Sequence, residues 1–223
     1  TLIKGFASIG DADRAMALFQ DMRTDGVESN HIVFTALINA HAKNGLMKRA
    51  EQLMEEMKNE GCKPNAITYS SMIRGHCVRG DLSSALQVFE QMVDCGFRAD
   101  AVIFNTLLDG CVQHRNFELA DELLLKMKNA KVAPSNFTLS IIVKMWSKRG
   151  DLDKAFEVVR SALKDSTGPK VDAQVGACIV GACIHNRAPE RALEIFEEMK
   201  TWPSFDGPDN NTYAALISGL PRL

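Results

Sequence analysis

The feature that most constrains this chain is a repeat of 35 residues. The stretches 31–65 and 66–100 can be laid over each other without a gap, which places Gly45 over Gly80 and Gly61 over Gly96. One alanine position recurs along the whole chain in steps of 35 residues, with a last step of 37. These alanines are Ala15, Ala50, Ala85, Ala120, Ala155 and Ala192. A period of this length is typical of a repeat array, in which each unit buries its core against its neighbours.

Each unit predicts two helices. In the stretch 66–100, apolar residues follow helical spacing from Ile67 to Cys77, Gly80 interrupts, and a second apolar face runs from Leu82 to Met92. Expected N-caps of the second helices are Asp11, Asp81, Asn116 and Asp151, and expected left-handed glycines after them are Gly26, Gly61 and Gly96. No segment alternates as a strand would, so we expect an all-α fold.

The register also sets the boundaries of the units. It gives a partial repeat at 1–30, full units at 31–65, 66–100, 101–135, 136–172 and 173–209, and the start of a further unit at 210–223. The units at 136–172 and 173–209 each carry two extra residues in the loop that closes them. Because the chain begins in the middle of the pattern, we expect it to be a piece of a longer array.

Composition argues against several classes of function. A net charge of −2 provides no overall positive field to attract nucleic acid. No apolar run approaches the ~20 residues needed to span a bilayer. The six cysteines have no zinc-ligand spacing, and no Walker, GxSxG or zinc-deaminase motif is present, so we expect no enzyme, no cofactor, no metal and no small-molecule substrate. One position of the first helices reads His41, His76, Cys111, Trp146 and Cys183, which we interpret as packing rather than metal binding.

Several short motifs recur in the units. Lys63-Pro64-Asn65 ends one unit, Ile67-Thr68-Tyr69-Ser70 opens the next, Gly80-Asp81-Leu82 stands near its middle, and Phe89-Glu90-Gln91-Met92 follows. With the step of 35 residues, rather than the 34 of tetratricopeptide repeats, these motifs resemble the pentatricopeptide repeat (PPR) family, in its plain 35-residue class. The resemblance implies a right-handed α-solenoid whose first helices line a groove for single-stranded RNA. It also implies residence in a mitochondrion or chloroplast.

In that family two side chains of each unit select one base, namely the fifth residue and the last. The implied pairs are Thr35 with Asn65 for adenine, Ser70 with Asp100 for guanine, Asn105 with Ser135 for a pyrimidine (cytosine favoured), and Ser140 with Asp172 for guanine. The two inserted residues blur the placement of Asp172. The unit at 173–209 has Ala177 with Asp209 and looks degenerate, because alanine offers no hydrogen-bonding group. The implied sequence is 5′-A-G-C/U-G-3′.

The resemblance implies two further sets of contacts. The second residue of each unit wedges a base against its neighbour, and here these residues are Ile32, Ile67, Val102 and Phe137, whereas Gln174 departs from the pattern. Side chains near the end of the first helices face phosphate in the family, and here these are Lys43, Arg79, Lys148 and Arg149. Val78, Gln113 and His185 interrupt this basic row.

Two interpretations of these residues stay open. Asn65, Asp100 and Ser135 directly precede a first helix, where an N-cap is favoured without any RNA. The leading hypothesis is an organellar protein that binds single-stranded RNA in RNA processing, stabilisation or translation. The alternative is a structural subunit of a large organellar ribonucleoprotein, such as the mitochondrial ribosome, that contacts protein or folded RNA without reading bases. The near-neutral charge and the interrupted basic row favour the alternative.

Overall fold

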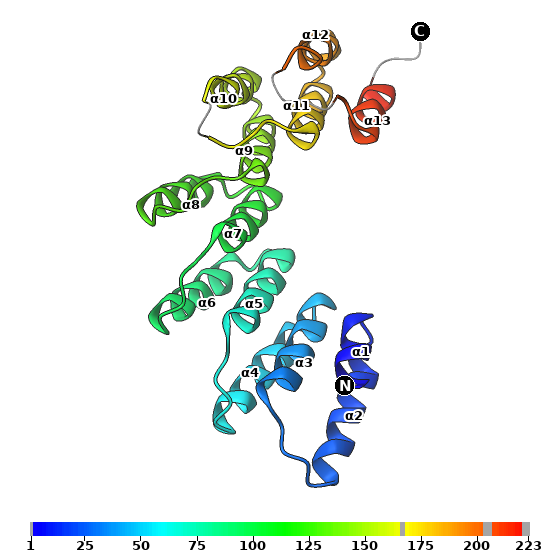
Figure 1. Cartoon of the computed structure of the whole chain (residues 1–223), viewed down its shortest axis with the longest axis vertical. Helices are drawn as coiled ribbons and strands as arrows, with labels where there is room; N and C mark the ends of the chain where they lie inside the picture. The colour runs from blue at the N-terminus through cyan, green and yellow to red at the C-terminus, as the bar shows by residue number, and fades with distance from the viewer. Residues whose placement is uncertain (1, 166–167, 203–206, 220–223) are drawn as a thin grey trace. The chain divides into compact units, whose positions relative to one another are not determined.

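The computed structural model describes residues 2–165, 168–202 and 207–219, and every regular element among them is a helix (Figure 1). The first helices of the units are α1 Leu2–Ser8, α3 His31–Lys43, α5 Ala66–Arg79, α7 Ala101–Gln113, α9 Asn136–Arg149, α11 Ala173–His185 and α13 Asn210–Gly219. The second helices are α2 Ala12–Thr24, α4 Met47–Asn59, α6 Leu82–Asp94, α8 Phe117–Asn129, α10 Leu152–Lys164 and α12 Pro189–Met199. The predicted all-α class is confirmed, and from α3 onward each first helix begins at the first residue of a predicted unit.

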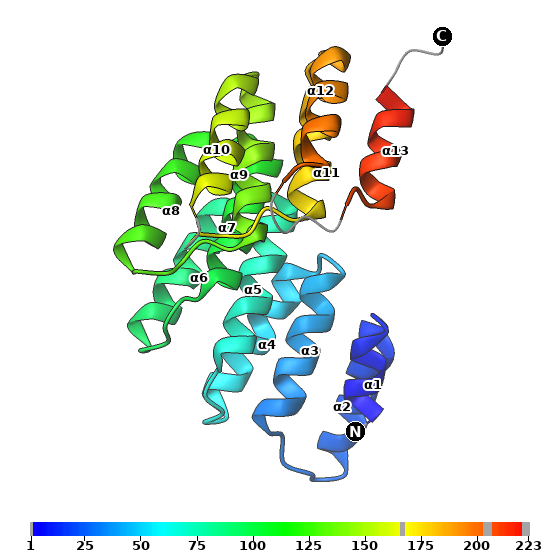
Figure 2. The same cartoon turned by 45° about the horizontal axis from the view of Figure 1, so that its top comes forward.

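The chain divides into two compact units, Thr1–Cys111 and Val112–Leu223. In the former, α1, α3 and α5 pack in succession, and α2, α4 and α6 pair with them as a second layer (Figures 1 and 2). In the latter, α9, α11 and α13 pack in the same way, and α10 and α12 cover them. Each compact unit is therefore a stack of helical hairpins. Residues 166–167 and 203–206 of the predicted longer loops, and 220–223 of the predicted last stretch, lie outside the described residues.

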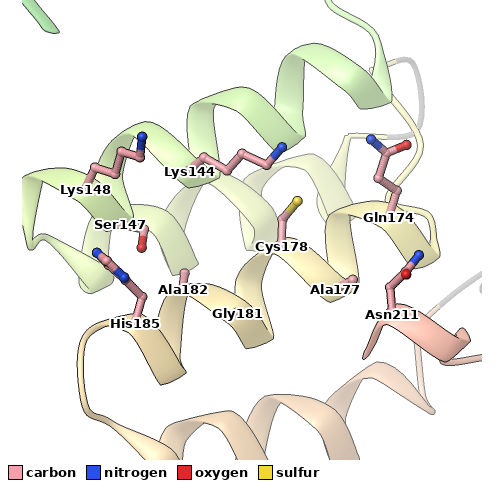
Figure 3. A pocket seen from close by; sticks show the side chains of 10 residues that line it. All are labelled: Lys144, Ser147, Lys148, Gln174, Ala177, Cys178, Gly181, Ala182, His185 and Asn211. Carbon is pink, nitrogen blue, oxygen red and sulfur yellow. The ribbon is translucent and has the colours of Figure 1, made fainter. Parts of the chain in front are cut away.

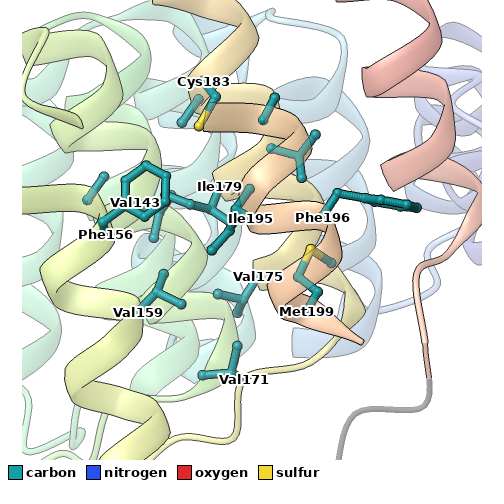
Figure 4. Packing of buried hydrophobic residues seen from close by; sticks show 14 of the residues in the cluster. Val143, Phe156, Val159, Val171, Val175, Ile179, Cys183, Ile195, Phe196 and Met199 are labelled. Carbon is teal, nitrogen blue, oxygen red and sulfur yellow. The ribbon is translucent and has the colours of Figure 1, made fainter. Parts of the chain in front are cut away.

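Small residues on the second helices allow the layers to meet. The repeating alanines Ala15, Ala50, Ala85, Ala120, Ala155 and Ala192 are all 0% exposed. In the second compact unit, α9 and α11 contribute Val143, Val175 and Ile179 to one core, and α10 and α12 contribute Val159 and Ile195 (Figure 4). A helical hairpin cannot bury such a face by itself, so each one depends on the next.

Helix ends follow the expected capping chemistry. The side chains of Asp11, Asp81, Asn116 and Asp151 each accept a hydrogen bond from a backbone N–H in the first turn of a second helix. The glycines predicted to be left-handed, Gly26, Gly61 and Gly96, have φ of 72°, 75° and 84°. Lys131 occupies the equivalent position of the following unit with φ of 55°. The turn geometry therefore persists where the sequence loses its glycine.

The mixed row of His, Cys and Trp residues belongs to the packing, as expected. His41, His76, Cys111 and Cys183 are at most 4% exposed, and Nδ1 of His41 lies 2.8 Å from the carbonyl oxygen of Leu37 in its own helix. No group of three or more His, Cys, Asp or Glu side chains in the described part of the chain is placed to hold a metal ion. None of the helices there has the length and apolar character to cross a membrane.

Two glycines of the first helices have opposite surroundings. A Cβ atom added to Gly110 would lie 2.8 Å from Cβ of Cys77 and 3.5 Å from its Cα, because α7 approaches α5 closely there. A Cβ atom added to Gly181 on α11 would meet nothing within 4 Å. Replacing each glycine with alanine therefore separates two effects: the steric cost of close helix packing at Gly110 and the gain in helix propensity at Gly181.

We expect Gly110→Ala to lower the free energy of unfolding by about 1–3 kcal/mol, because the added methyl group overpacks the contact between α5 and α7. Gly181→Ala is the matched control and should raise it by about 0.5–1 kcal/mol, because alanine favours the helix and the space is open. Urea denaturation of both variants measures the difference. Equal stability of Gly110→Ala and the parent chain would contradict the close approach.

Burial also determines which thiols react. Burial raises the pKa of the Cys77 thiol to about 12 and the pKa values of Cys111 and Cys183 to about 11. Cys95 is exposed at the end of α6. Because the thiolate is the reactive form, we expect iodoacetamide at pH 8 to modify Cys95 well before the three buried cysteines. Mass spectrometry of the folded chain measures the order, and the unfolded chain, in which all six cysteines should react, is the control.

Candidate nucleic-acid interface

Large apolar side chains lie exposed at the second position of several repeats, three of them in the first compact unit and one in the second. The four predicted wedge residues keep substantial exposed fractions, 50% for Ile32, 64% for Ile67, 59% for Val102 and 56% for Phe137. Each stands three residues before the predicted base-reading side chain of the same helix, so the two lie on one helix face. Apolar side chains of this size are usually buried, and their recurrence at one position of four successive first helices creates places where flat groups can pack.

The structure brings Thr35 and Asn65 together through a third residue. Oγ1 of Thr35 lies 2.9 Å from Oγ1 of Thr68, and Thr68 donates from Oγ1 to Oδ1 of Asn65 at 3.1 Å. The backbone N–H of Thr68 donates to the same Oδ1 at 3.0 Å, which caps α5. The oxygen of Asn65 is therefore used by the cap, and its Nδ2 group is the part left to contact a ligand.

The next pair, Ser70 with Asp100, offers different hydrogen-bonding groups. Oδ1 of Asp100 accepts a hydrogen bond from the backbone N–H of Ile103 at 3.0 Å, as an N-cap does. Asp100 is exposed, and the cap does not use its second carboxylate oxygen. Ser70 is half-buried and donates from Oγ to the carbonyl oxygen of Ala66 at 2.7 Å. This pair therefore presents acceptors, whereas Asn65 presents a donor.

The remaining two pairs are less accessible or fall in separate parts. Asn105 is half-buried on α7 in the first compact unit, and Ser135 caps α9 in the second. Ser140 is only 1% exposed. Asp172 caps α11 with Oδ1 at 3.0 Å from the backbone N–H of Val175, and its Oδ2 accepts a hydrogen bond from Nδ2 of Asn136. Ser140 and Asp172 are thus more enclosed than Ser70 and Asp100.

Most of the predicted phosphate-facing side chains form hydrogen bonds with other residues of this chain. Arg79 donates to the carbonyl oxygen of Gly45 at 2.7 Å, and Lys148 donates to that of Val112 at 3.0 Å. Arg149 donates to the carbonyl oxygen of Phe117 at 3.0 Å and pairs with Asp121 at 2.6 Å. Lys43 lies exposed at the end of α3. Three of the four basic side chains therefore join neighbouring hairpins.

Sequence reasoning missed two kinds of residue at this interface. Thr68 and Thr138 are 0% exposed and complete capping boxes with Asn65 and Ser135. The signal was present, because a threonine stands three residues after each of those caps. Asn136 was also missed, because polar residues also stand at the first position of other units, as His31 and Asn210 do, and nothing in the sequence sets it apart.

Several solved structures share the fold of this chain, and some of them are complexes with RNA. The crystal structure of the pentatricopeptide repeat protein PPR10 from maize matches with a TM-score of 0.72 and 23% identity, over 99% of this chain and 31% of that one. PPR10 in complex with an 18-nt psaJ RNA element matches with a TM-score of 0.59 and 19% identity, over 98% of this chain and 36% of that one. The chain thus spans about a third of the length of PPR10.

A shorter solved structure also matches. The PPR domain of Arabidopsis thaliana protein-only RNase P 1 in complex with tRNA has a TM-score of 0.60 and 19% identity, over 71% of this chain and 84% of that one. At these identities the likeness shows the fold. A comparison with curated proteins finds no match.

Two family models match this chain. The model described as the PPR repeat family matches residues 29–78 and 99–148, and the model described as the PPR repeat matches residues 1–27, 67–97 and 178–202. Together these matches run through most of the chain, and the helices they cover form the hairpins described above. The chain belongs to the pentatricopeptide repeat family.

Proposed function

We propose that this chain binds single-stranded RNA along the exposed side of its first helices and reads the sequence 5′-A-G-C/U-G-3′. Binding rather than catalysis is the activity we assign to these repeats. The site of action we propose is a mitochondrion or chloroplast, where occupancy of the RNA would govern its processing, stability or translation.

The observation that carries the proposal is the recurrence of an exposed apolar side chain at one position of the repeats, at Ile32, Ile67 and Val102 in the first compact unit and at Phe137 in the second. Each of these side chains is at least half exposed at the same position of a first helix. Unstacked bases are flat and apolar on both faces, and single-stranded RNA is recognised by stacking and by contacts to base edges. A wedge in each of these four repeats, with polar groups one helical turn away, matches the spacing of one base per repeat.

The hydrogen-bonding groups left by the caps support the order of bases. Asn65 has its Nδ2 donor left over, which suits a base edge that presents an acceptor nitrogen, as adenine does. Asp100 has a carboxylate oxygen left over, which suits a base edge that presents N–H donors, as guanine does. The donor offered by Asn65 therefore agrees with adenine, and the acceptor offered by Asp100 agrees with guanine.

The structural role of the basic residues favours the scaffold alternative. Arg79, Lys148 and Arg149 already bind carbonyl oxygens of the preceding unit. Fewer free cations mean fewer phosphate contacts, and therefore less affinity that is independent of sequence. A scaffold that grips protein or folded RNA would show no dependence on base identity, which separates it from the leading proposal.

The decisive substitution is Asp100→Asn. Asparagine keeps an oxygen for the cap on Ile103 but replaces the second oxygen with an amide donor, so the preference at the second base should move from guanine towards adenine. Fluorescence anisotropy with RNAs containing AGCG or AACG in identical unstructured flanks measures the change. We expect a shift in relative affinity of about 1–3 kcal/mol, the range for one good base contact.

Asp81→Asn is the matched control for this experiment. Asp81 belongs to the same predicted unit and also caps a helix, accepting from the backbone N–H of Ser84 at 3.1 Å, but it does so on the second helix α6. It should leave the preference between the two RNAs unchanged. If Asp100→Asn behaves like Asp81→Asn, the base-reading assignment is wrong; binding that ignores base identity in every variant would support the scaffold.

A further inference from the structure

Two groups of lysines stand apart in the second compact unit. Lys144 and Lys148 lie on α9 beside a hollow of about 440 Å³ on the first helices, which is also lined by Ala177 and Gly181 of α11 (Figure 3). This hollow belongs to the interface already described. The other group lies at the C-terminal ends of the second helices and in the loops that close the repeats, and the interface described above makes no use of it.

Five lysines form this second group, which we call the lysine edge. Lys126 and Lys128 lie in the last turn of α8, Lys131 lies in the loop that follows it, Lys164 ends α10, and Lys170 lies in the loop after α10. All five are exposed. Among the residues that the structure describes, none of their ammonium groups forms a hydrogen bond or an ion pair. The lysine edge therefore offers positive charge that the described fold does not use.

The two loops of the lysine edge lie side by side. Residues 130–135 lead from α8 to α9 and residues 168–172 lead into α11, and the two stretches are neighbours in both views (Figures 1 and 2). Where they enter these first helices, Nδ2 of Asn136 donates a hydrogen bond to Oδ2 of Asp172. The lysines of two successive repeats therefore share one edge of the second compact unit.

The lysine edge differs in charge from the corresponding segments of the earlier repeats. Those segments each carry more acidic than basic side chains, and they are 20–30, 55–65 and 90–100. Segment 125–135 carries three lysines and no acidic residue. In segment 160–172 the acidic residues are Asp165 and Asp172, and Asp172 caps α11. A local basic surface is therefore present on a chain whose net charge is −2.

The composition of the lysine edge indicates which kind of nucleic acid suits it. Proteins that hold a single strand combine cations with aromatic side chains on which the bases stack. Segments 125–135 and 160–172 contain no aromatic residue. Charge without stacking suits the outside of a duplex, where the bases are enclosed and the phosphates face outward. A lysine is a point charge with three donors, so its contacts with phosphate do not depend on base sequence.

We propose that the lysine edge binds the phosphates of a double-stranded RNA segment on the 3′ side of the tetranucleotide. The inference rests on the proposed function, because the lysines belong to the repeats 101–135 and 136–172, to which the last two of the four bases are assigned. The single strand occupies the first helices, and the stem lies against the lysine edge. The chain then selects its RNA by sequence and also by the stem that follows the sequence.

The experiment uses RNAs of equal length that carry AGCG followed either by a hairpin stem or by an unstructured tail, and a third RNA with the stem on the 5′ side. Fluorescence anisotropy over a series of salt concentrations measures their affinities. The test variant keeps helix propensity while it removes three charges of the lysine edge, through Lys126→Gln, Lys128→Gln and Lys164→Gln.

The matched control removes the same charge from exposed positions of the first compact unit, through Lys48→Gln, Lys58→Gln and Lys63→Gln. Thermal unfolding of both variants checks that the fold is intact. For the parent chain and the control we expect the RNA with the 3′ stem to bind about tenfold more tightly than the unstructured RNA at low salt, with the difference falling as salt rises. In the test variant the slope of log Kd against log salt for the stem RNA should fall by about 2–3, close to 0.9 for each lysine removed.

Equal affinity of the parent chain for the stem and unstructured RNAs overturns this inference, while a preference for AGCG over AACG keeps the proposed function. A stem preference that survives in the test variant, or that is lost in the control as well, also overturns it. So does a 5′ stem that binds as tightly as the 3′ stem. Lysines that bind phosphatidylserine vesicles while the RNAs bind alike assign the edge to a lipid surface and overturn it too. Failure of every RNA to bind overturns both proposals.

Discussion

Each hairpin of this chain depends on burial between neighbours. A pair of 13-residue helices such as α3 and α4 has no core of its own, and its apolar side chains become buried only when α1 and α5 lie against it. The free energy of folding is therefore spread over the interfaces between hairpins. The sequence period, the fully buried alanines and the close approach at Gly110 all follow from that single requirement.

Hydrogen bonds across the ends of the first helices reinforce these interfaces. Asn44 donates to the carbonyl oxygen of Gly10, Arg79 to that of Gly45 and Asn186 to that of Ser147. These carbonyl groups lie in the last turn of a first helix or in the turn that follows it, and a side chain from the next repeat donates to each of them. A basic residue at such a helix end, as Arg79 is, therefore helps to hold neighbouring hairpins together. Fewer of its N–H groups are then available to a phosphate.

The sequence could predict the structural features that depend on residues close together in the chain. Helix starts, the caps at Asp81 and Asp151 and the left-handed turn at Gly96 depend on residues within a few positions of each other. The sequence could not show that Asn136 binds Asp172 or that Thr68 joins Thr35 to Asn65, because those contacts connect residues 33 to 36 positions apart. The hollow of about 440 Å³ over Ala177 and Gly181 of α11 could not be predicted either, because it arises where the other full repeats carry larger side chains. The family resemblance supplied the candidate positions, but side-chain burial distinguishes the open Asp100 from the enclosed Ser140.

The capping role of Asn65, Asp100 and Asp172 restricts which residue types can stand at the last position of a repeat. Only short side chains with an oxygen can stabilise the start of the following helix, and asparagine, aspartate and serine do so about equally well. Exchanges among these three leave the solenoid intact while they reverse the polarity of the group offered to a ligand. Under the proposed base reading, single substitutions that folding does not oppose would change the preferred RNA, so specificity could diverge faster than architecture.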